Sequence, residues 1–443
     1  MVPAGAPRTS NKLIGEGGNY TKWQLIGSCR CRLSLKVNGS VQAQQQLLST
    51  IIGTSRMAQR PQIYSKLNYP KFAELNNLAS EKLGGKVLFA TDDWFAAAEN
   101  LLKEDPPEWR EGEFTVYGKW MDGWETRRKR KPGHDWCIIR LGMPGTIAGV
   151  DVDTSYFTGN YAPRVSVQAA TLAGPEERQL PQRVGGMGCE ASEVELTQAA
   201  KLNSQNWTTI IPITEAKPGY HDTCHNFLQV TPATSTTRYT HIRLNIFPDG
   251  GVARFRVFGS AVPNWSSVSH SQMVDLAAAV SGGSCVGYSD AHYGHPRNLI
   301  SPGRGINMGD GWETARRLDR PPVLIEDERG VLKVSGYEWA ILRLGHTGTV
   351  HELEIDTHHF KGNFPDSCRV DGCLLPLDSD LQYIKEKAVW KTILPSQKLH
   401  SHTQHHFKQE VTAVGPVSHV RVVMAPDGGI SRVRVLGKIF NKL

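Results

Sequence analysis

Two glutamates, each with an arginine three residues later, are the residues best suited to chemistry in this sequence. Glu125 and Arg128 lie in DGWETRRKR, and Glu313 and Arg316 lie in DGWETARRL. A carboxyl group can move a proton during bond cleavage, and a guanidinium group binds a small carboxylate through two parallel hydrogen bonds. Residues three apart on a regular strand face opposite sides, so these side chains converge only where the Asp-Gly turn bends the chain. A structural ion pair beside the tryptophan is the equally weighted alternative.

A second matched segment offers an aspartate and an asparagine. VDVDTSYFTGNYAP contains Asp153 and Asn160, and LEIDTHHFKGNFPD contains Asp356 and Asn363. The aspartates are candidate catalytic residues. The asparagines are candidate substrate-binding residues, because an amide side chain pairs with planar donor–acceptor groups. Each type also has a local use, since Asp caps turns and Asn beside Gly favours tight turns. The sequence leaves both uses open.

Three histidines, His134, His358 and His405, are candidate proton carriers, because imidazole titrates near neutral pH. His358 is matched by Ser155 in the first copy of the segment, and His134 has no counterpart in the second. His405 is matched with His225 as one of the few histidines common to both copies. A loop position without chemistry is the alternative for His134.

Histidine clustering also raises the question of a metal site. His358 and His359 are adjacent, with Asp356 nearby as a carboxylate ligand. Successive residues of an extended strand point to opposite faces, so both rings cannot reach one metal from a regular strand. No His-Glu-X-X-His motif occurs. We therefore assign no metal ligand and expect no cofactor, while a divalent metal stays open because many hydrolases use one.

These residues recur because the chain is an internal duplication. The GWET string, an Arg-Leu-Gly string, the DT segment above and the pair THIRLNIFPDGGVARFRVFG and SHVRVVMAPDGGISRVRVLG occur in the same order in both copies. The offset changes from 188 to 203 to 178 residues along the chain, which insertions in loops explain. Two similar folding units must therefore position the candidate residues.

Strands dominate the expected secondary structure. His241–Ile246 and Val252–Phe258 alternate polar and apolar residues around Pro-Asp-Gly-Gly, which predicts an antiparallel hairpin. Ile138–Leu141 and Ile147–Val152 are expected as two short strands separated by Gly-Met-Pro-Gly. The fold class is therefore all-β, with two tandem β-sandwiches and few short helices.

Two helices are expected. Asp92–Leu102 has Thr91 as a cap, so Asp92 would complement the helix dipole, with substrate binding kept as the second hypothesis for it. Another helix is expected over Ser271–Val280, inside a linker. The expected division is a disordered extension over 1–56, a first repeat over 57–262, the linker over 263–283 and a second repeat over 284–443.

Bulk composition excludes several classes. The 443 residues carry a formal charge of +7, but +6 of it lies in residues 1–56, where seven Lys or Arg face one Glu. The rest offers no basic face for nucleic acid. No stretch approaches the roughly 18–20 apolar residues of a membrane span. The eight cysteines lack paired zinc or redox spacing, which favours reduced thiols in an intracellular compartment, cytoplasmic or peroxisomal.

With these strings, the sequence resembles the allantoicase family over roughly residues 85–437. TDDWFAAAENLL, KWMDGWETRRKR, VDTSYFTGNYAP, GDGWETARR and DTHHFKGNFP carry the resemblance. It implies tandem jelly rolls, and RFRVFG and RVRVLG look like the closing strands of galactose-binding-like domains. It also implies a hydrolase of purine catabolism that converts allantoate and water to ureidoglycolate and urea. We expect the chain to form a homo-oligomer.

That reaction would give the candidates roles. Arg128 and Arg316 would hold the substrate carboxylate, the asparagines and Asp92 would bind its ureido groups, and the Glu, Asp and His candidates would move protons. A ligand-binding jelly-roll pair without turnover, or a decayed allantoicase, is the alternative, because fold does not dictate function. The glutamate–arginine strings in both copies favour the enzyme.

Overall fold

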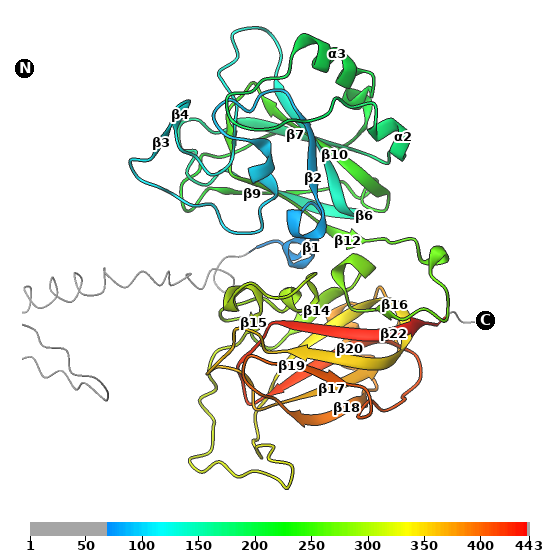
Figure 1. The fold of residues 1–443 in the computed structure, drawn as a ribbon. Helices are drawn as coiled ribbons and strands as arrows, with labels where there is room; N and C mark the ends of the chain where they lie inside the picture. The colour runs from blue at the N-terminus through cyan, green and yellow to red at the C-terminus, as the bar shows by residue number, and fades with distance from the viewer. Residues whose placement is uncertain (1–68, 441–443) are drawn as a thin grey trace, which may run out of the picture. The chain divides into compact units, whose positions relative to one another are not determined.

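One 19-residue strand organises the first repeat, and it belongs to both layers of a β-sandwich (Figure 1). The first half of β6 (Asp135–Asp153) pairs with β10 (Arg238–Phe247) and β2 (Lys86–Ala90). Its second half pairs with β12 (Arg254–Ala261) and β9 (His225–Gln229). The layers are completed by β7 (Arg164–Ala170) and β8 (Thr208–Glu215) beyond β10, and by β1 (Asn76–Asn77) beyond β12.

The second repeat has the same plan around β16 (Glu338–Asp356). One layer holds β14 (Ser284–Tyr288), β20 (Val417–Ala425), β17 (Ser367–Cys373) and β18 (Lys391–Lys398), and the other holds β19 (Gln404–Phe407), β22 (Arg432–Ile439) and β13 (Val274–Asp275). These are the two tandem β-sandwiches that the sequence predicts, so the all-β fold class is confirmed. The computed structural model describes residues 69–440, and the extension expected over 1–56 lies outside the described residues.

The expected hairpin is wrong. β10 and β12 lie on opposite sides of β6 and do not pair with each other. The Pro-Asp-Gly-Gly segment between them leaves the sheet, because β11 (Gly251–Val252) pairs with β5 (Trp124–Glu125). In the second repeat β21 (Gly429–Ile430) pairs in the same way with β15 (Trp312–Glu313). Within each repeat, the Gly-Trp-Glu-Thr segment is therefore hydrogen-bonded to the Pro-Asp-Gly-Gly segment.

The two short strands expected on either side of Gly-Met-Pro-Gly form one strand. Pro144 falls inside β6, where the register with β10 shifts between Arg140 and Gly145. A proline cannot donate to a sheet ladder, and this break in the ladder is where it is tolerated.

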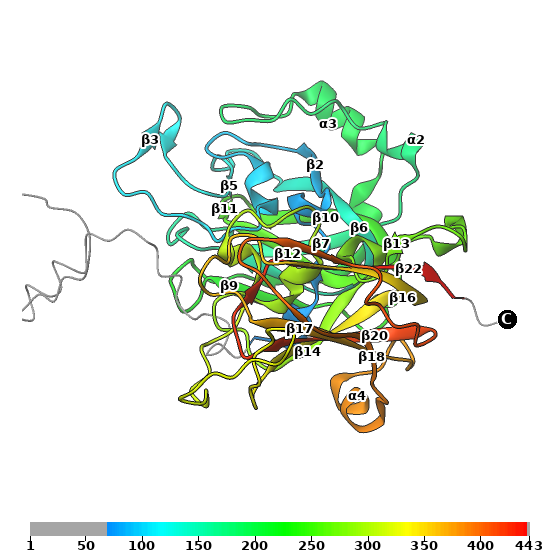
Figure 2. The same ribbon diagram turned by 60° about the horizontal axis from the view of Figure 1, so that its bottom comes forward.

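Helices are few, as predicted, but neither expected helix is formed as proposed. In place of a helix over Asp92–Leu102 there is only a 3₁₀ turn over Ala98–Leu102, and the Thr91 hydroxyl donates to Asp135 instead of capping it. Within Ser271–Val280 the chain pairs as β13, and a 3₁₀ turn follows. The α-helices within residues 69–440 are α2 (Gly174–Glu177), α3 (Glu193–Ala200) and α4 (Leu381–Lys387), which leads into β18 (Figure 2).

The remaining short elements are irregular. The 3₁₀ turns are η1 (Lys71–Glu74), η2 (Glu81–Leu83), η3 (Ala98–Leu102), η4 (Ser204–Asn206), η5 (Trp265–Ser267), η6 (Ala279–Ser281), η7 (Pro296–Ile300) and η8 (Met308–Asp310), and a small ribbon joins β3 (Phe114–Thr115) to β4 (Gly118–Lys119). No helix of the described chain has both the length and the apolar character needed to cross a membrane. The six cysteines within residues 69–440 are all free, as predicted for reduced thiols.

Each β5-type strand is anchored by its tryptophan. Trp124 and Trp312 are fully buried, and each indole N–H donates to a backbone carbonyl at 2.8 Å, that of Asp92 and of Asp290 respectively. Opposite Glu125, Gly251 has no room for a side chain, since a Cβ would lie 2.0 Å from the ring of Phe157. The glutamate that follows each tryptophan is thereby held at a defined place.

Candidate active site

Four segments meet around each glutamate. In the first repeat they are residues 92–96, 121–129, 153–163 and 248–253, and in the second they are residues 290–294, 310–317, 356–366 and 426–431. We call each set a glutamate junction. Its backbone is tied by the β5–β11 or β15–β21 ladder and by bridges such as Ala96 to Glu125 and Gly294 to Glu313. The junctions bring together most of the residues singled out in the sequence.

Each glutamate is held by the predicted asparagine. The amide nitrogen of Asn160 donates to Oε1 of Glu125 at 2.7 Å, and that of Asn363 donates to Oε1 of Glu313 at 2.5 Å. Burial raises the pKa of both glutamates, and the asparagine bond opposes this rise. Each junction thus contains an oriented carboxyl group that holds its proton more tightly than an exposed one.

The arginines do not form the structural ion pair with glutamate that the sequence left open. Arg128 pairs instead with Asp249 of the Pro-Asp-Gly-Gly segment at 2.9 Å, and donates to the carbonyl of Gly159. Its positive charge nevertheless opposes the rise that burial causes in the pKa of Glu125. Arg316 is exposed and has no ion-pair partner among the described residues. The second junction therefore has a guanidinium group available to an anionic ligand.

The aspartates at the ends of the long strands have the geometry of turn caps. Oδ1 of Asp153 accepts the amide N–H of Ser155 at 2.9 Å, and Oδ1 of Asp356 accepts that of His358 at 2.8 Å. Both carboxylates are buried. Oδ2 of Asp356 lies 3.1 Å from the guanidinium group of Arg304. This is the local use that the sequence analysis named as the alternative to catalysis.

Asp92 braces the first junction from the side. Its Oδ2 accepts from Nε of Arg127 at 2.8 Å, and its Oδ1 accepts the amide N–H of Trp94 at 3.0 Å. It does not begin a helix. The neighbouring guanidinium group of Arg127 stacks over the ring of Trp94 at 4.4 Å. Asp92 therefore fixes the strand that carries Glu125.

His134 lies next to β10, where its Nε2 is 3.0 Å from Oδ1 of Asn245 and its ring packs on Phe247. Burial lowers its pKa, so the ring is mostly neutral near pH 7. A neutral ring with one nitrogen engaged is compatible with either a proton carrier or a loop residue.

The sheet register corrects the match of His405 with His225. His225 lies opposite Asp153, whereas the residue opposite Asp356 is Gln404, so His405 corresponds to Asn226. Both ring nitrogens of His405 are used by the backbone, with the carbonyl of Ile355 at 3.0 Å and the amide of His400 at 2.9 Å. This leaves neither nitrogen for a substrate proton.

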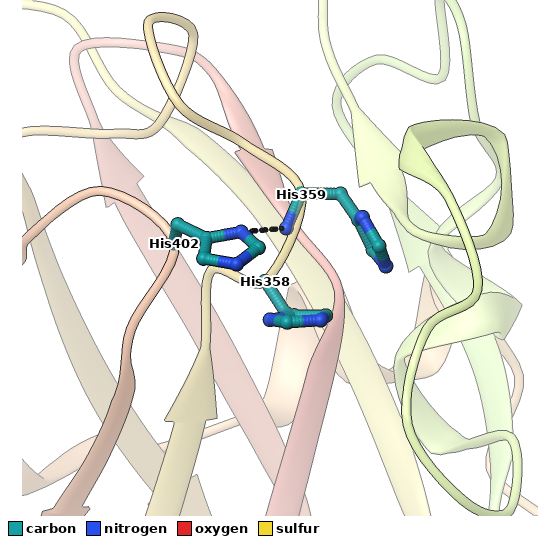
Figure 3. A group of neighbouring side chains, drawn as sticks. All are labelled: His358, His359 and His402. Carbon is teal, nitrogen blue, oxygen red and sulfur yellow. Dashed lines mark hydrogen bonds between the residues drawn. The ribbon is translucent and has the colours of Figure 1, made fainter.

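His358 lies in a cluster with His359 and His402 (Figure 3). The centroid of the His358 ring lies 4.2 Å from that of His359 and 4.1 Å from that of His402. The expectation that neighbouring histidines point apart is wrong here. These residues follow β16 in a turn where His359 has φ 72°, so the alternation of a strand does not apply.

Sequence reasoning missed a buried ion pair behind each glutamate. Arg254 is 1% exposed and its Nη2 lies 2.6 Å from Oδ2 of Asp122, the residue that opens the DGWE turn. In the second repeat Arg432 makes the same pair with Asp310 at 2.8 Å. The sequence did contain a signal for this pair. RFRVFG and RVRVLG both begin with an arginine at an inward strand position, and both copies have an aspartate directly before Gly-Trp-Glu.

The comparisons agree with this architecture. The family model described as "Allantoicase repeat" matches residues 76–262 and 274–440. A "Probable allantoicase" of Pseudomonas savastanoi pv. phaseolicola is 43% identical over 368 residues, covering 83% of this chain and 97% of the relative. One of Pseudomonas fluorescens is 43% identical over 374 residues, covering 84% and 99%.

A solved structure is similar along its whole length. The crystal structure of an allantoicase from Saccharomyces cerevisiae aligns with a TM-score of 0.60 at 31% identity, covering 90% of this chain and 98% of that one. Both copies of the repeat and nearly the full length of the relatives are thus matched. The chain belongs to the allantoicase family.

Proposed function

We infer that this chain is an allantoicase that hydrolyses allantoate to ureidoglycolate and urea. Family membership supports the reaction, and the observation that carries the chemistry is the oriented glutamate–asparagine pair in both junctions. A module that only binds a ligand has no need of two carboxyl groups whose pKa values are raised by burial beside a hydrogen-bonded amide.

The glutamate is suited to act first as an acid and then as a base. Allantoate carries two ureido groups and a carboxylate on one carbon. When the bond from that carbon to a ureido nitrogen breaks, the nitrogen must receive a proton, and a carboxyl group whose pKa is raised by burial is suited to donate it. A water molecule then supplies the hydroxyl group to the carbon, and its remaining proton returns to the glutamate. The atoms balance as allantoate plus water to ureidoglycolate plus urea.

We propose that the second junction carries the main activity. Arg316 has no ion-pair partner within residues 69–440, whereas Arg128 is engaged by Asp249. A free guanidinium group can bind the substrate carboxylate without first breaking an internal pair. Asn363, which orients Glu313, would also present its amide to a ureido group.

The test is direct turnover. The purified full chain is incubated with allantoate, and urea is measured against time, with heat-inactivated protein and no-protein controls. The proposal predicts urea released in equal amount to the allantoate consumed. Folded protein that binds allantoate but releases no urea above the controls would instead favour the non-catalytic or decayed alternative.

We also propose an intracellular location, cytoplasmic or peroxisomal, and a homo-oligomer. The free state of the six described cysteines supports a reducing compartment. Sedimentation velocity of the purified chain tests the assembly, because a single species at the monomer mass of 49.0 kDa would contradict it.

A further inference from the structure

A histidine cluster on the second repeat has features of a metal site that the hydrolytic reaction above does not use. One ring nitrogen from each of His358, His359 and His402 lies within 4.8 Å of the other two. Nitrogen ligands at about 2.0–2.1 Å from a tetrahedral metal lie roughly 3.3 Å apart. The rings therefore need to approach by no more than about 1.5 Å, which side-chain rotation supplies.

Two of the three rings are already poised as ligands. Nε2 of His359 donates to the carbonyl of Gly305 at 2.9 Å, which leaves its Nδ1 with a free lone pair. A backbone carbonyl on the opposite ring nitrogen is the usual partner of a metal-binding histidine. The ring of His358 makes no hydrogen bond within the described residues, so either of its nitrogens can coordinate.

His402 is the exposed member of the cluster and the one that must change partner. Its Nδ1 accepts the amide N–H of His359 at 2.9 Å, drawn as a dashed line in Figure 3. A metal takes the same lone pair, so binding releases that amide. Because His402 is at the surface, its ring can turn without disturbing the core.

The first repeat provides the strongest argument, because it forms a related turn with other side chains at the equivalent positions, although Gly219 lacks the positive φ of 52° that His402 has. The amide N–H of Gly219 donates to the carbonyl of Phe157 at 3.0 Å, as that of His402 donates to Phe360 at 3.1 Å. Tyr156 has φ 69°, close to the value of His359. The three equivalent positions are Ser155, Tyr156 and Gly219 in the first repeat and His358, His359 and His402 in the second.

In the first repeat the amide N–H of Tyr156 donates to the carbonyl of Gly219 at 3.0 Å, whereas in the second the amide N–H of His359 donates to the ring of His402. The turn thus accounts for one histidine at most, and it does not explain why three converge. The positive charge of Arg304, which lies near the cluster, is balanced by its ion pair with Asp356 and so does not prevent a cation from binding. We propose that His358, His359 and His402 bind one divalent transition metal ion of the Zn²⁺ type, with a remaining coordination position open to solvent or a ligand.

The experiment titrates Zn²⁺ into the full chain, without a histidine tag, in competition with a chromophoric chelator. The proposal predicts one tight equivalent per chain. The variant H358S/H359Y/H402G, which installs the residues of the first repeat at the three positions, removes that equivalent. Each single substitution weakens binding at least about tenfold, the loss seen even for outer partners of a metal site. Thermal unfolding without metal confirms that the variants are folded.

A matched control separates this cluster from the other histidines. H400K/H406F installs first-repeat residues at two exposed histidines outside the cluster, and it should bind Zn²⁺ like the wild type. Co²⁺ bound to the wild type should show the visible bands of a low-coordinate nitrogen site, absent in the triple variant. Zn²⁺ binding unchanged in the triple variant, or no stoichiometric binding by the wild type, would overturn the proposal. Neither result depends on allantoate turnover.

Discussion

Replacing Arg254 with methionine should destabilise the first repeat more than any surface change, because it leaves the buried Asp122 with only the partly exposed Lys103 as a cation, at 3.1 Å. The guanidinium group donates to Oδ2 of Asp122 at 2.6 Å, and to the carbonyls of Asp122, Ala253 and Asp105 at 2.9, 2.8 and 3.0 Å. Removing one partner of a buried ion pair costs about 3–5 kcal/mol. For a domain of this size that corresponds to a fall in Tm of about 6–20 °C.

The assay is thermal unfolding followed by circular dichroism, with a double-mutant cycle. Arg254→Met, Asp122→Asn and the double variant are compared, and Arg432→Met serves as the equivalent change in the second repeat. The double variant should be more stable than the sum of the single losses implies, because it lacks the carboxylate that Arg254→Met leaves buried beside Lys103 alone. Additive losses, or a fall in Tm below about 2 °C for Arg254→Met, would show that the pair does not hold the DGWE turn.

Three further predictions concern the junctions and the long strand. Asn363→Ala removes the bond that lowers the pKa of Glu313, so the high-pH limb of kcat/KM should move to higher pH; an unmoved limb would separate Glu313 from the titrating acid. Burial opposes protonation of His225, but its bond to a buried carboxylate raises its pKa, so its stabilisation exists below the ordinary pKa of 6.5 and is lost as pH rises through the folded pKa. His225→Gln should therefore cost more, about 1 kcal/mol, at pH 6 than at pH 9 in urea unfolding, and an equal cost at both would contradict this. Gly251→Ala should cost about 1–3 kcal/mol because its Cβ would meet an aromatic ring at 2.0 Å, whereas Gly159→Ala, with open space, should be neutral.

The sequence predicted the fold class and much of the glutamate junctions because the duplication supplied two examples of each pattern. Residues common to both copies, such as Glu125 with Asn160, proved to be direct partners. Glu125 on β5 and Asn160 in the turn after β6 are 35 residues apart, so segment similarity marked each residue but not the bond between them. No property of the sequence indicated which of the matched groups would touch.

Sequence reasoning failed where strand connection depends on the whole sandwich. Polar and apolar residues alternate around Pro-Asp-Gly-Gly in the same way whether the two strands form a hairpin or flank a third strand. Here β6 lies between them, and the local sequence does not show this. The strand rule for His358 and His359 failed for a related reason, since the residue types do not reveal that the chain has a positive φ at His359, three residues after β16 ends. The buried Arg254 was missed because charged residues on a strand are ordinarily solvated.

The central claim is that a junction glutamate moves the proton that frees urea. The most direct measurement is kcat/KM for allantoate in Glu313→Gln and Glu125→Gln, two isosteric changes that keep a hydrogen-bond partner for the asparagine. The account predicts a loss of about 10²- to 10⁴-fold for Glu313→Gln, with a smaller loss for Glu125→Gln. Wild-type rates in both variants, with both proteins folded, would contradict it.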